Sequence, residues 1–573
     1  MIILITLNII PTSGKIVNNK SYIQLVFNLD NPPTPVRNIA EFEPMEGVLI
    51  RYPFGISYEI ISEMSEAVEV VTIVVSSSEQ NYVYSQYQSH GVNVDHCSFL
   101  IAPSDTYWTR DYGPWYAFTG NDELAVIDFS FYGYGNYYPN DNNIPWTFAN
   151  SLGFPHYQMP LYHEGGNYMT DGQGISASTD MLWGINPGKT HNEVREIVQD
   201  YLGIDVYHVV PDPNGAWLEH IDCWGKYLAP DKIMIREVPI GHPQYEEIEA
   251  TATYFSNQLS CYGTPYKIAR VYTPDNQPYT NSLILNNKVL VPITGSPWDD
   301  EAIESYEDAL PGYEVLGFTG SWYSIDALHC RTKGIPDRGM LYIEHIPIVE
   351  DQFNHSFYEI ESKITPYSGK ALIEEKTGVY WKVEPYHWNF SEFEYVGDDK
   401  YIAHIPVQDN NSKFYYYIHA EDESGRIENH PYIGAPMAYY FNGIFINELP
   451  QNPSINGPST LKNDEEGTFT ISTQDPDGDD VFFYIEWGDG SIVDWDGPYK
   501  SNEYVPYQHQ WSMDDTYNIK IKTKDIFGEE SDWSNHEIKV TKAKFRLYHS
   551  VKSLQDFNNL YYQILKFIIQ GFN

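Results

Sequence analysis

Four short stretches place carboxylates, histidine or a thiol beside glycine or aromatic residues. They are YWTRDYGPW (107–115), HEGGNYMTDG (163–172), EHIDCW (219–224) and DALHCRTKG (326–334). Such groups can perform nucleophilic and acid–base chemistry. Because a histidine, a carboxylate and a thiol lie within residues 220–223, the first question is whether that thiol is the nucleophile.

The spacing within 220–223 argues against Cys223 as the nucleophile. Side chains two residues apart on a strand share a face. If this segment is a strand, His220 and Asp222 point the same way, and Cys223 points to the opposite face. We therefore expect Cys223 to be a core thiol and the nucleophile to come from another segment.

Cys330 is the candidate for that role. It lies where an apolar strand gives way to polar, glycine-containing sequence, and the neighbouring Arg331 and Lys333 would favour its thiolate. A single cysteine near a histidine is more often a buried small hydrophobic residue. The assignment therefore depends on the four stretches taken together.

The other two stretches each allow two interpretations. In 107–115, tryptophans flank Arg110 and Asp111, which suits an organic cation but also a local ion pair. In 163–172, the adjacent glycines would let a ligand approach a carboxylate, Glu164, held at a strand end. The alternative is a tight turn with a solvated Glu164.

Length and composition limit the possible classes of protein. A chain of 573 residues suggests three or four domains, and 42% hydrophobic with 16% aromatic residues can fill large cores. The net charge of 34 − 79 = −45 argues against general nucleic-acid binding and suits cationic partners. The four cysteines form no C-x-x-C pair, which argues against a zinc ribbon or a thioredoxin-like motif.

Alternating helix and strand patterns run from about residue 41 to 347. Residues 58–75 place apolar side chains at helical spacing and then continue into a β-branched strand. Residues 190–210 repeat this plan, with a capping box at Thr190 and Glu193 and a glycine that ends the helix. This half is predicted to be α/β, with short strands.

The remaining regions have other patterns. Short strands with turn residues between them predict a β-sandwich at 348–446 and, after a Pro/Asn-rich linker, another at 451–541. Residues 1–34 are an N-terminal extension whose apolar run of about ten residues is too short to span a bilayer. We expect an incomplete signal peptide there and an extracellular or cell-surface location. The basic tail, 542–573, has no assigned role.

The order of the motifs resembles that in a known enzyme family. Trp108-Thr-Arg-Asp111, Glu164-Gly-Gly-Asn167, His220-Ile-Asp222 and His329-Cys330 resemble the agmatine deiminases and the Porphyromonas-type peptidylarginine deiminases. These hydrolases act on guanidino groups and have the pentein fold, a five-bladed pseudosymmetric α/β propeller. The resemblance implies that 35–347 is such a domain, followed by Ig-like and PKD-like β-sandwich modules.

The resemblance also implies roles for individual residues. Cys330 would attack the guanidinium carbon, Asp111 and Asp222 would hold the N–H groups, and His220 would shuttle protons. Paired carboxylates suit a planar, permanently charged guanidinium. The reaction would pass through a covalent thiouronium adduct to a ureido group and ammonia, with no metal or organic cofactor. Further expected substrate contacts are Trp108, Glu164, Trp217, Asn281, Asn136 and Tyr138.

Two features point to different substrates. The peptidyl branch binds the carboxylate of a C-terminal arginine with an Arg-x-Arg pair, but the matching positions here are Asn136 and Tyr138. Glu164 matches the agmatine branch, whereas 327–337 and the β modules resemble the secreted peptidyl branch. We expect a peptidylarginine deiminase-type enzyme that needs no C-terminal carboxylate. The alternatives are agmatine as the substrate and a cation-binding pentein without turnover.

The second β module contains a run of aspartates, DPDGDD. Asp475, Asp477 and Asp479 could bind calcium, but Asp480 occupies the place where an EF-hand loop needs glycine. We therefore expect a simple acidic turn. The two modules are expected to contribute adhesion, spacing or stability.

Overall fold

The computed structural model describes residues 31–120, 122–135, 138–353, 357–408, 411–444, 446–542 and 561–566, with only the backbone of Tyr134. The expectations for residues 1–30, for Asn136 and for most of the basic tail lie outside the described residues. The chain divides into two compact units, one reaching to Asn442 and the other beginning at Gly443, with the two short segments 353–356 and 407–411 belonging to the second.

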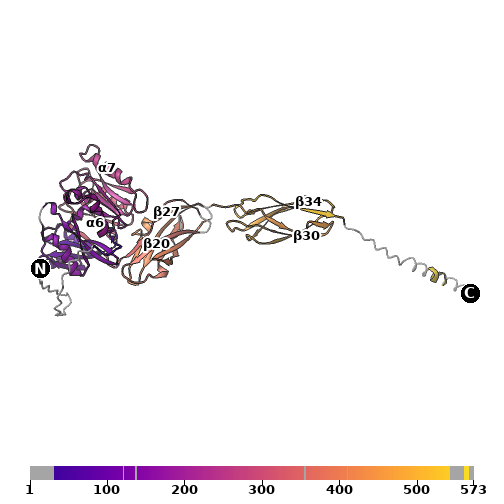
Figure 1. The fold of residues 1–573 in the computed structure, drawn as a ribbon, viewed down its shortest axis with the longest axis horizontal. Coiled ribbons are helices and arrows are strands. Elements are labelled where there is room, and N and C mark those ends of the chain that lie inside the picture. The colour runs from indigo at the N-terminus through magenta and orange to yellow at the C-terminus, as the bar shows by residue number, and fades with distance from the viewer. Residues whose placement is uncertain are drawn as a thin grey trace. The chain divides into compact units, whose positions relative to one another are not determined.

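Residues 37–336 form five separate small sheets (Figure 1). The first contains β1 (Arg37–Asn38), β5 (Trp115–Thr119), β6 (Glu123–Phe131) and β7 (His156–His163). The next three are β8–β10 (Met169–Thr170, Ile175–Thr179, Val206–Val210), β11–β13 (Gly225–Ala229, Lys232–Glu237, Lys267–Tyr272) and β14–β16 (Leu283–Leu285, Lys288–Ile293, Glu314–Thr319). The fifth contains β17 (Lys333–Pro336), β2 (Met45–Arg51), β3 (Glu69–Val74) and β4 (Cys97–Ile101).

Each of these sheets repeats one local plan. A parallel pair of strands is joined through a helical connection, and an additional strand pairs antiparallel with the first of them, as in β11, β12 and β13. In the fifth sheet the additional strand is β17, so a strand from the end of this region pairs with β2 from its beginning. The α/β class expected for this half is confirmed.

The helices follow the expected local signals. They are α1 (Tyr58–Ala67), α2 (Ser77–Ser89), α3 (Thr109–Tyr112), α4 (Ile144–Leu152), α5 (Met181–Ile185), α6 (His191–Leu202), α7 (Tyr245–Ser256) and α8 (Asp299–Ala309). The capping box predicted at Thr190 and Glu193 starts α6, and Gly203 ends it in a left-handed conformation with φ of 67°. In the part of the chain that is described, no helix is long and apolar enough to cross a membrane.

A β-sandwich follows the five sheets. One sheet contains β18 (Leu341–Glu344), β20 (Phe357–Pro366), β24 (Lys400–Pro406) and β23 (Glu394–Gly397). The other contains β19 (Gln352–Phe353), β27 (Tyr439–Ile444), β25 (Ser412–Glu421), β21 (Gly378–Val383), β22 (Asn389–Glu392) and β26 (Ile427–His430). The strand β18 lies before the expected boundary at 347 but belongs to the sandwich, because it pairs antiparallel with β20 rather than with any of the five preceding sheets.

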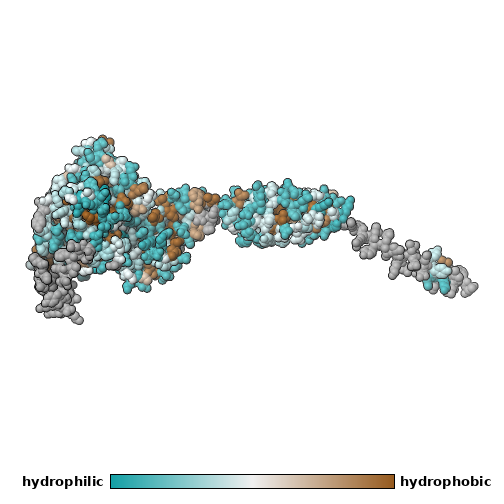
Figure 2. Space-filling model, viewed as in Figure 1, coloured by the Kyte–Doolittle hydropathy of each residue, from teal (hydrophilic) through white to brown (hydrophobic). Residues whose placement is uncertain are grey.

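The last module is a second sandwich. Its smaller sheet contains β28 (Ser454–Asn456), β30 (Glu466–Ser472) and β33 (Val505–Gln510). Its larger sheet contains β29 (Thr460–Lys462), β35 (Ser534–Thr541), β34 (Thr516–Asp525), β31 (Val481–Glu486) and β32 (Ile492–Tyr499). Phe469, Trp487 and Trp511 fill the core between the sheets, whereas hydrophilic residues cover most of the visible outer face (Figure 2).

Candidate active site

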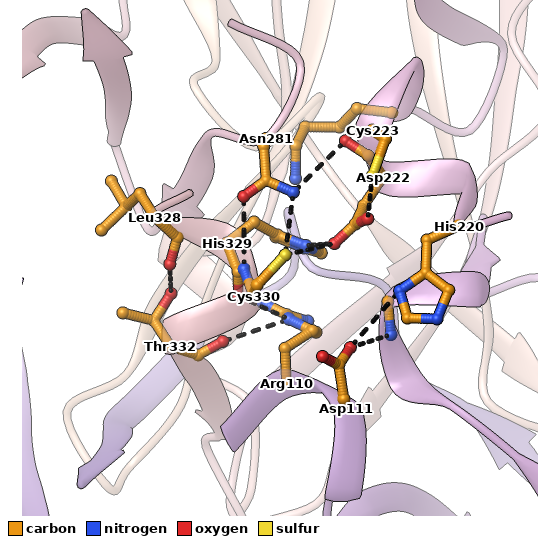
Figure 3. A network of polar contacts seen from close by, with 12 residues as sticks. Arg110, Asp111, His220, Asp222, Cys223, Asn281, Leu328, His329, Cys330 and Thr332 are labelled. Atoms are coloured by element: carbon orange, nitrogen blue, oxygen red, sulfur yellow. Dashed lines mark hydrogen bonds and ion pairs between the residues drawn. The ribbon is translucent and has the colours of Figure 1, made fainter. Parts of the chain in front are cut away.

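The thiol of Cys330 lies at the centre of a buried polar cluster (Figure 3). Cys330 belongs to a short 3-10 turn, His329–Arg331, between β16 and β17. The Asn281 side chain binds it twice, because Nδ2 donates to Sγ at 3.3 Å and Oδ1 accepts from the Cys330 backbone N–H at 3.3 Å. These two bonds hold the thiol in one orientation.

Asp111 reaches the same cluster from α3. Its Oδ1 accepts a hydrogen bond from the Gly166 backbone N–H at 3.0 Å. A Cβ at Gly166 would lie 2.6 Å from both Asp111 Oδ1 and His220 Nδ1, and one at Gly165 would lie 1.9 Å from the Arg110 carbonyl oxygen. The two glycines are therefore required because α3 and the side chains of Asp111 and His220 approach this turn so closely.

His220 is held between two carboxylates. Its Nε2 lies 2.6 Å from Glu164 Oε2, with both side chains fully buried, and its Nδ1 lies 3.6 Å from Asp111 Oδ1. Burial opposes the charged ring, but the hydrogen bond to Glu164 and the charge of Asp111 outweigh it and raise the pKa of His220 to about 9. The alternative of a solvated Glu164 is therefore wrong.

The segment 220–223 is not a strand, contrary to the expectation. His220 is extended, and Ile221–Cys223 forms a 3-10 turn closed by the Cys223 N–H donating to the His220 carbonyl at 3.2 Å. The Cys223 Sγ consequently lies 3.6 Å from Asp222 Oδ1 instead of facing away from it. Burial raises the pKa of the Cys223 thiol well above its ordinary value, with Asp222 adding to the effect.

Asp222 is positioned by a chain of buried groups. His329 Nδ1 lies 2.7 Å from Asp222 Oδ2, and His329 Nε2 lies 2.6 Å from Glu41 Oε2. Glu41 also contacts Arg110 at 2.7 Å and Lys226 at 2.8 Å. Burial alone would raise the pKa of Asp222. The hydrogen bond from His329 and the positive charges of His220 and Lys226 outweigh burial and lower this pKa, which favours the ionised carboxylate.

Glu41 and His329 were not among the expected site residues. His329 had a sequence signal, because it directly precedes Cys330 in the motif. Glu41 had none, because it reaches His329 only through the packing of segments far apart in the chain. Both act on the cluster through Asp222, so we regard them as positioning residues.

A cavity of about 380 Å³ leads to Cys330. Its lining residues are Trp108, Asp111, Trp217, Leu218, Tyr323, Ser324, Ile325, Asp326 and Cys330, and none of these is an arginine or a lysine. Trp217 and Tyr323 are 73% and 65% exposed and form the rim. The pocket therefore has aromatic walls, an acidic interior and a thiol.

Two further expected substrate contacts are placed differently. Asn281 holds the Cys330 thiol and is not among the residues that line the pocket. Tyr138 is half-buried, stacks on Phe131 with ring centroids 6.2 Å apart, and does not line the pocket either. Asn136 lies outside the described residues.

The environment of Cys330 differs from the expected one. Burial, followed by the charges of Asp222 and Asp111, raises the pKa of the thiol well above its usual value. Arg331 does not offset this, because its guanidinium binds both oxygens of Asp326 at 2.8 Å. The expectation that the neighbouring cations favour the thiolate is therefore wrong, because burial and the two carboxylates oppose ionisation of the thiol.

Comparison with known proteins gives consistent matches. A sequence model described as Porphyromonas-type peptidyl-arginine deiminase matches residues 37–336, ending with the last residue of β17. A Shewanella baltica protein, provisionally named an agmatine deiminase, is 24% identical over 292 residues, which is 44% of this chain and 78% of that protein. The solved agmatine deiminase of Enterococcus faecalis aligns at 18% identity with 54% of this chain and 99% of its own, at a TM-score of 0.49. A PKD domain of an M14-like peptidase from a Thermoplasmatales archaeon is 39% identical over 17% of this chain and 100% of that domain, at a TM-score of 0.17.

Proposed function

Since the chain belongs to the Porphyromonas-type peptidyl-arginine deiminase family, we propose that its buried cluster converts a guanidinium group into a ureido group and releases ammonia. The observation that carries the proposal is the convergence of Cys330, His220, Asp111 and Asp222 in one buried site. Hydrolases of this family act on C–N bonds of linear amidines. Each group has the residue type that the reaction requires.

Binding would rest on the two carboxylates. A guanidinium presents several N–H donors in one plane and carries a permanent positive charge. Asp111 lines the pocket and Asp222 lies 3.7 Å from the Cys330 Sγ, so both carboxylates surround the thiol. A guanidinium bound between them would place its carbon next to the nucleophile.

The bound cation would also ionise the thiol. The negative charges that raise the Cys330 pKa are the ones that a guanidinium neutralises. Binding therefore favours loss of the thiol proton to solvent, and the thiolate forms where its electrophile is already in place. This couples activation of the nucleophile to the presence of the correct substrate.

Two steps then complete the reaction. The Cys330 thiolate adds to the guanidinium carbon, and a C–N bond breaks while the charged His220 gives a proton to the leaving ammonia. The resulting thiouronium adduct is attacked by water, whose proton passes to His220. Breaking the C–S bond, while the hydroxyl group of the adduct loses its remaining proton to solvent, gives the neutral ureido product and returns the thiolate and the charged histidine.

Agmatine is the substrate that the pocket suits best. The described lining offers no arginine or lysine to bind a carboxylate, and its charged members, Asp111 and Asp326, are acidic. Such a pocket favours a guanidine whose alkyl chain carries no carboxylate over one, such as arginine, whose alkyl chain ends in a carboxylate-bearing carbon. The curated relative named above is provisionally named an agmatine deiminase.

Arginine inside a peptide is the second candidate. The exposed rings of Trp217 and Tyr323 at the rim could contact a substrate larger than the pocket itself. In a peptide with an internal arginine, the α-carboxyl group of that arginine forms a peptide bond, so it likewise brings no carboxylate into the pocket. The same lining disfavours free arginine and C-terminal arginine.

The test is a comparison of four guanidines with wild type and Cys330→Ala. Ammonia release is measured on agmatine, free arginine, an internal-arginine peptide and a C-terminal-arginine peptide. We expect turnover of agmatine or the internal-arginine peptide, and none with Cys330→Ala. If wild type binds these guanidines but releases no ammonia from any of them, the chain is a cation-binding protein. A preference for C-terminal arginine would contradict the assignment of the pocket.

For the fold we propose a five-bladed propeller. The five repeats of one strand–strand–helix–strand plan support this arrangement, as does the pairing of β17 with β2, which joins the end of the region to its beginning.

A further inference from the structure

Three aspartates of the last module converge in the loop between β30 and β31. Carboxylate oxygens of Asp475, Asp477 and Asp479 all lie within 4.8 Å of one another. Asp475 Oδ1 accepts the backbone N–H groups of Asp477 at 2.9 Å and of Asp479 at 3.2 Å. Asp475 Oδ1 therefore holds the backbone of the loop through two hydrogen bonds, and Asp475 Oδ2 takes no part in them.

That second oxygen, Asp475 Oδ2, is buried and has no hydrogen-bond partner, and the residue is only 2% exposed. A buried carboxylate oxygen without a donor is strongly disfavoured. The side chains that converge with it, Asp477 and Asp479, are also carboxylates, and oxygens of all three lie within 4.8 Å of one another.

A second buried acceptor without a donor lies in the adjoining segment. Asn447 Oδ1 is buried and unpaired, while Asn447 Nδ2 donates to Asp525 Oδ2 at 2.7 Å. The next residue, Glu448, donates its backbone N–H to Asp477 Oδ2 at 2.7 Å. Residues 447–448 therefore contact both acidic loops of the module.

We propose that this cluster binds one calcium ion, with Asp475, Asp477 and Asp479 as ligands and with Asn447 and Asp525 completing an oxygen-only site. Calcium takes six to eight oxygen ligands in flexible geometry, which carboxylates, an amide oxygen and water can provide. The absence of sulfur and imidazole from these ligands disfavours zinc and copper. The expectation of a simple acidic turn does not account for the two unpaired acceptors.

The site is not an EF-hand loop. Asp480, at the position where that loop needs glycine, turns away to bind Lys500 Nζ at 2.9 and 3.0 Å. The proposed ligands instead come from the segment before the module, from the loop after β30 and from the last residue of β34. An ion bound there would fasten residues 447–448 to the module and order the entry of the chain into it.

The experiment is calorimetric titration of the full chain with CaCl₂ after dialysis against a chelator. We expect one calcium ion per chain, with a Kd of about 10⁻⁴ to 10⁻³ M as in extracellular modules, and much weaker binding of MgCl₂. Calcium should also slow proteolytic cleavage within residues 443–450. Asp475→Asn and Asp479→Asn should each weaken binding at least tenfold.

Asp480→Asn is the matched control, because it removes one negative charge from the same loop but not from the proposed ligands. It should bind calcium as the wild type does. Asp479 is half-buried, so its variant tests the site even if Asp475→Asn fails to fold. The proposal is overturned if wild type shows no saturable calcium binding up to about 10 mM, a concentration well above the expected Kd. Equal weakening in Asp480→Asn would also overturn it, since it would indicate a diffuse charge effect.

Discussion

At Cys330 the surrounding charges oppose ionisation, whereas at His220 they support the charged ring. The same carboxylate, Asp111, contributes to both effects. In the proposed reaction, a charged imidazole can protonate the leaving group, and a bound guanidinium would offset the carboxylates that oppose ionisation of the thiol.

The pKa of His220 predicts the alkaline limit of activity. In the proposed reaction the charged ring donates the proton to the leaving ammonia, so activity should fall as pH rises through about 9, the pKa of His220. Glu164→Gln removes a charge that raises this pKa, so the alkaline limb of the kcat/KM profile should move to lower pH. A pH–rate profile of both proteins tests this, and an unchanged limb in the variant would exclude His220 as the acid.

The two buried cysteines should respond differently to substitution. Cys330→Ser should lose nearly all activity, since a serine hydroxyl ionises far less readily than a thiol and is a much weaker nucleophile. Cys223→Ser should retain much of it, because the Cys223 thiol contacts Asp222 but has no place in the reaction. The measurement is steady-state ammonia release from both variants. An active Cys330→Ser together with an inactive Cys223→Ser would overturn the assignment of Cys330 as the nucleophile.

His329 should affect catalysis through Asp222. His329→Asn removes the hydrogen bond that orients the carboxylate, and kcat/KM should fall about 10- to 100-fold, the range typical of a supporting side chain. His156→Asn is the control, because His156 pairs with Asp128 through its Nε2 at 2.9 Å and contacts none of the site residues. A loss of thermal stability without a change in kcat/KM would show that His329 has only a structural role.

At the scale of the element, the 3-10 turn Gly165–Asn167 packs directly against α3 and the cluster. Gly166→Ala would place a methyl group 2.6 Å from Asp111 Oδ1 and His220 Nδ1, so it should abolish measurable activity. The control is Gly184→Ala in α5, where an added Cβ meets nothing within 4 Å and activity should be unchanged. Near-wild-type kcat/KM for Gly166→Ala would contradict the closeness of these groups.

At the scale of the whole molecule, the first sandwich is joined to the catalytic half by buried contacts. Arg37, next to β5, binds Glu43 at 2.6 Å and stacks on Tyr342 of β18 with its guanidinium carbon 3.8 Å from the ring centroid. Tyr262 bonds to His430 at 3.2 Å in the same interface. The two parts therefore belong to one compact unit.

Removing the Arg37 charge tests that interface. Arg37→Met leaves Glu43 buried without its cation, so the free energy of unfolding should fall by about 3–5 kcal/mol. Arg338→Met breaks an exposed pair with Glu46 and should lower it by less than about 1 kcal/mol. Denaturant unfolding of both variants measures the difference, and equal losses would refute the role of Arg37.

The sequence by itself determined the features that depend on neighbours along the chain. The capping box of α6, the alternating sandwich strands and the motifs around Asp111, Glu164, His220 and Cys330 act through residue type and short spacing. Their order carried the resemblance to the deiminase family, from which the convergence of these groups in one buried site was expected.

Only the tertiary structure decided how those groups act on one another. Glu41 reaches His329, β17 pairs with β2, and the Asn447 side chain binds Asp525 only after distant segments have packed together. The direction of a pKa shift depends on burial and on which charges surround a group in space. For this reason the sequence predicted a thiolate at Cys330 from its chain neighbours, whereas burial and the carboxylates of Asp222 and Asp111 in the folded site oppose its ionisation.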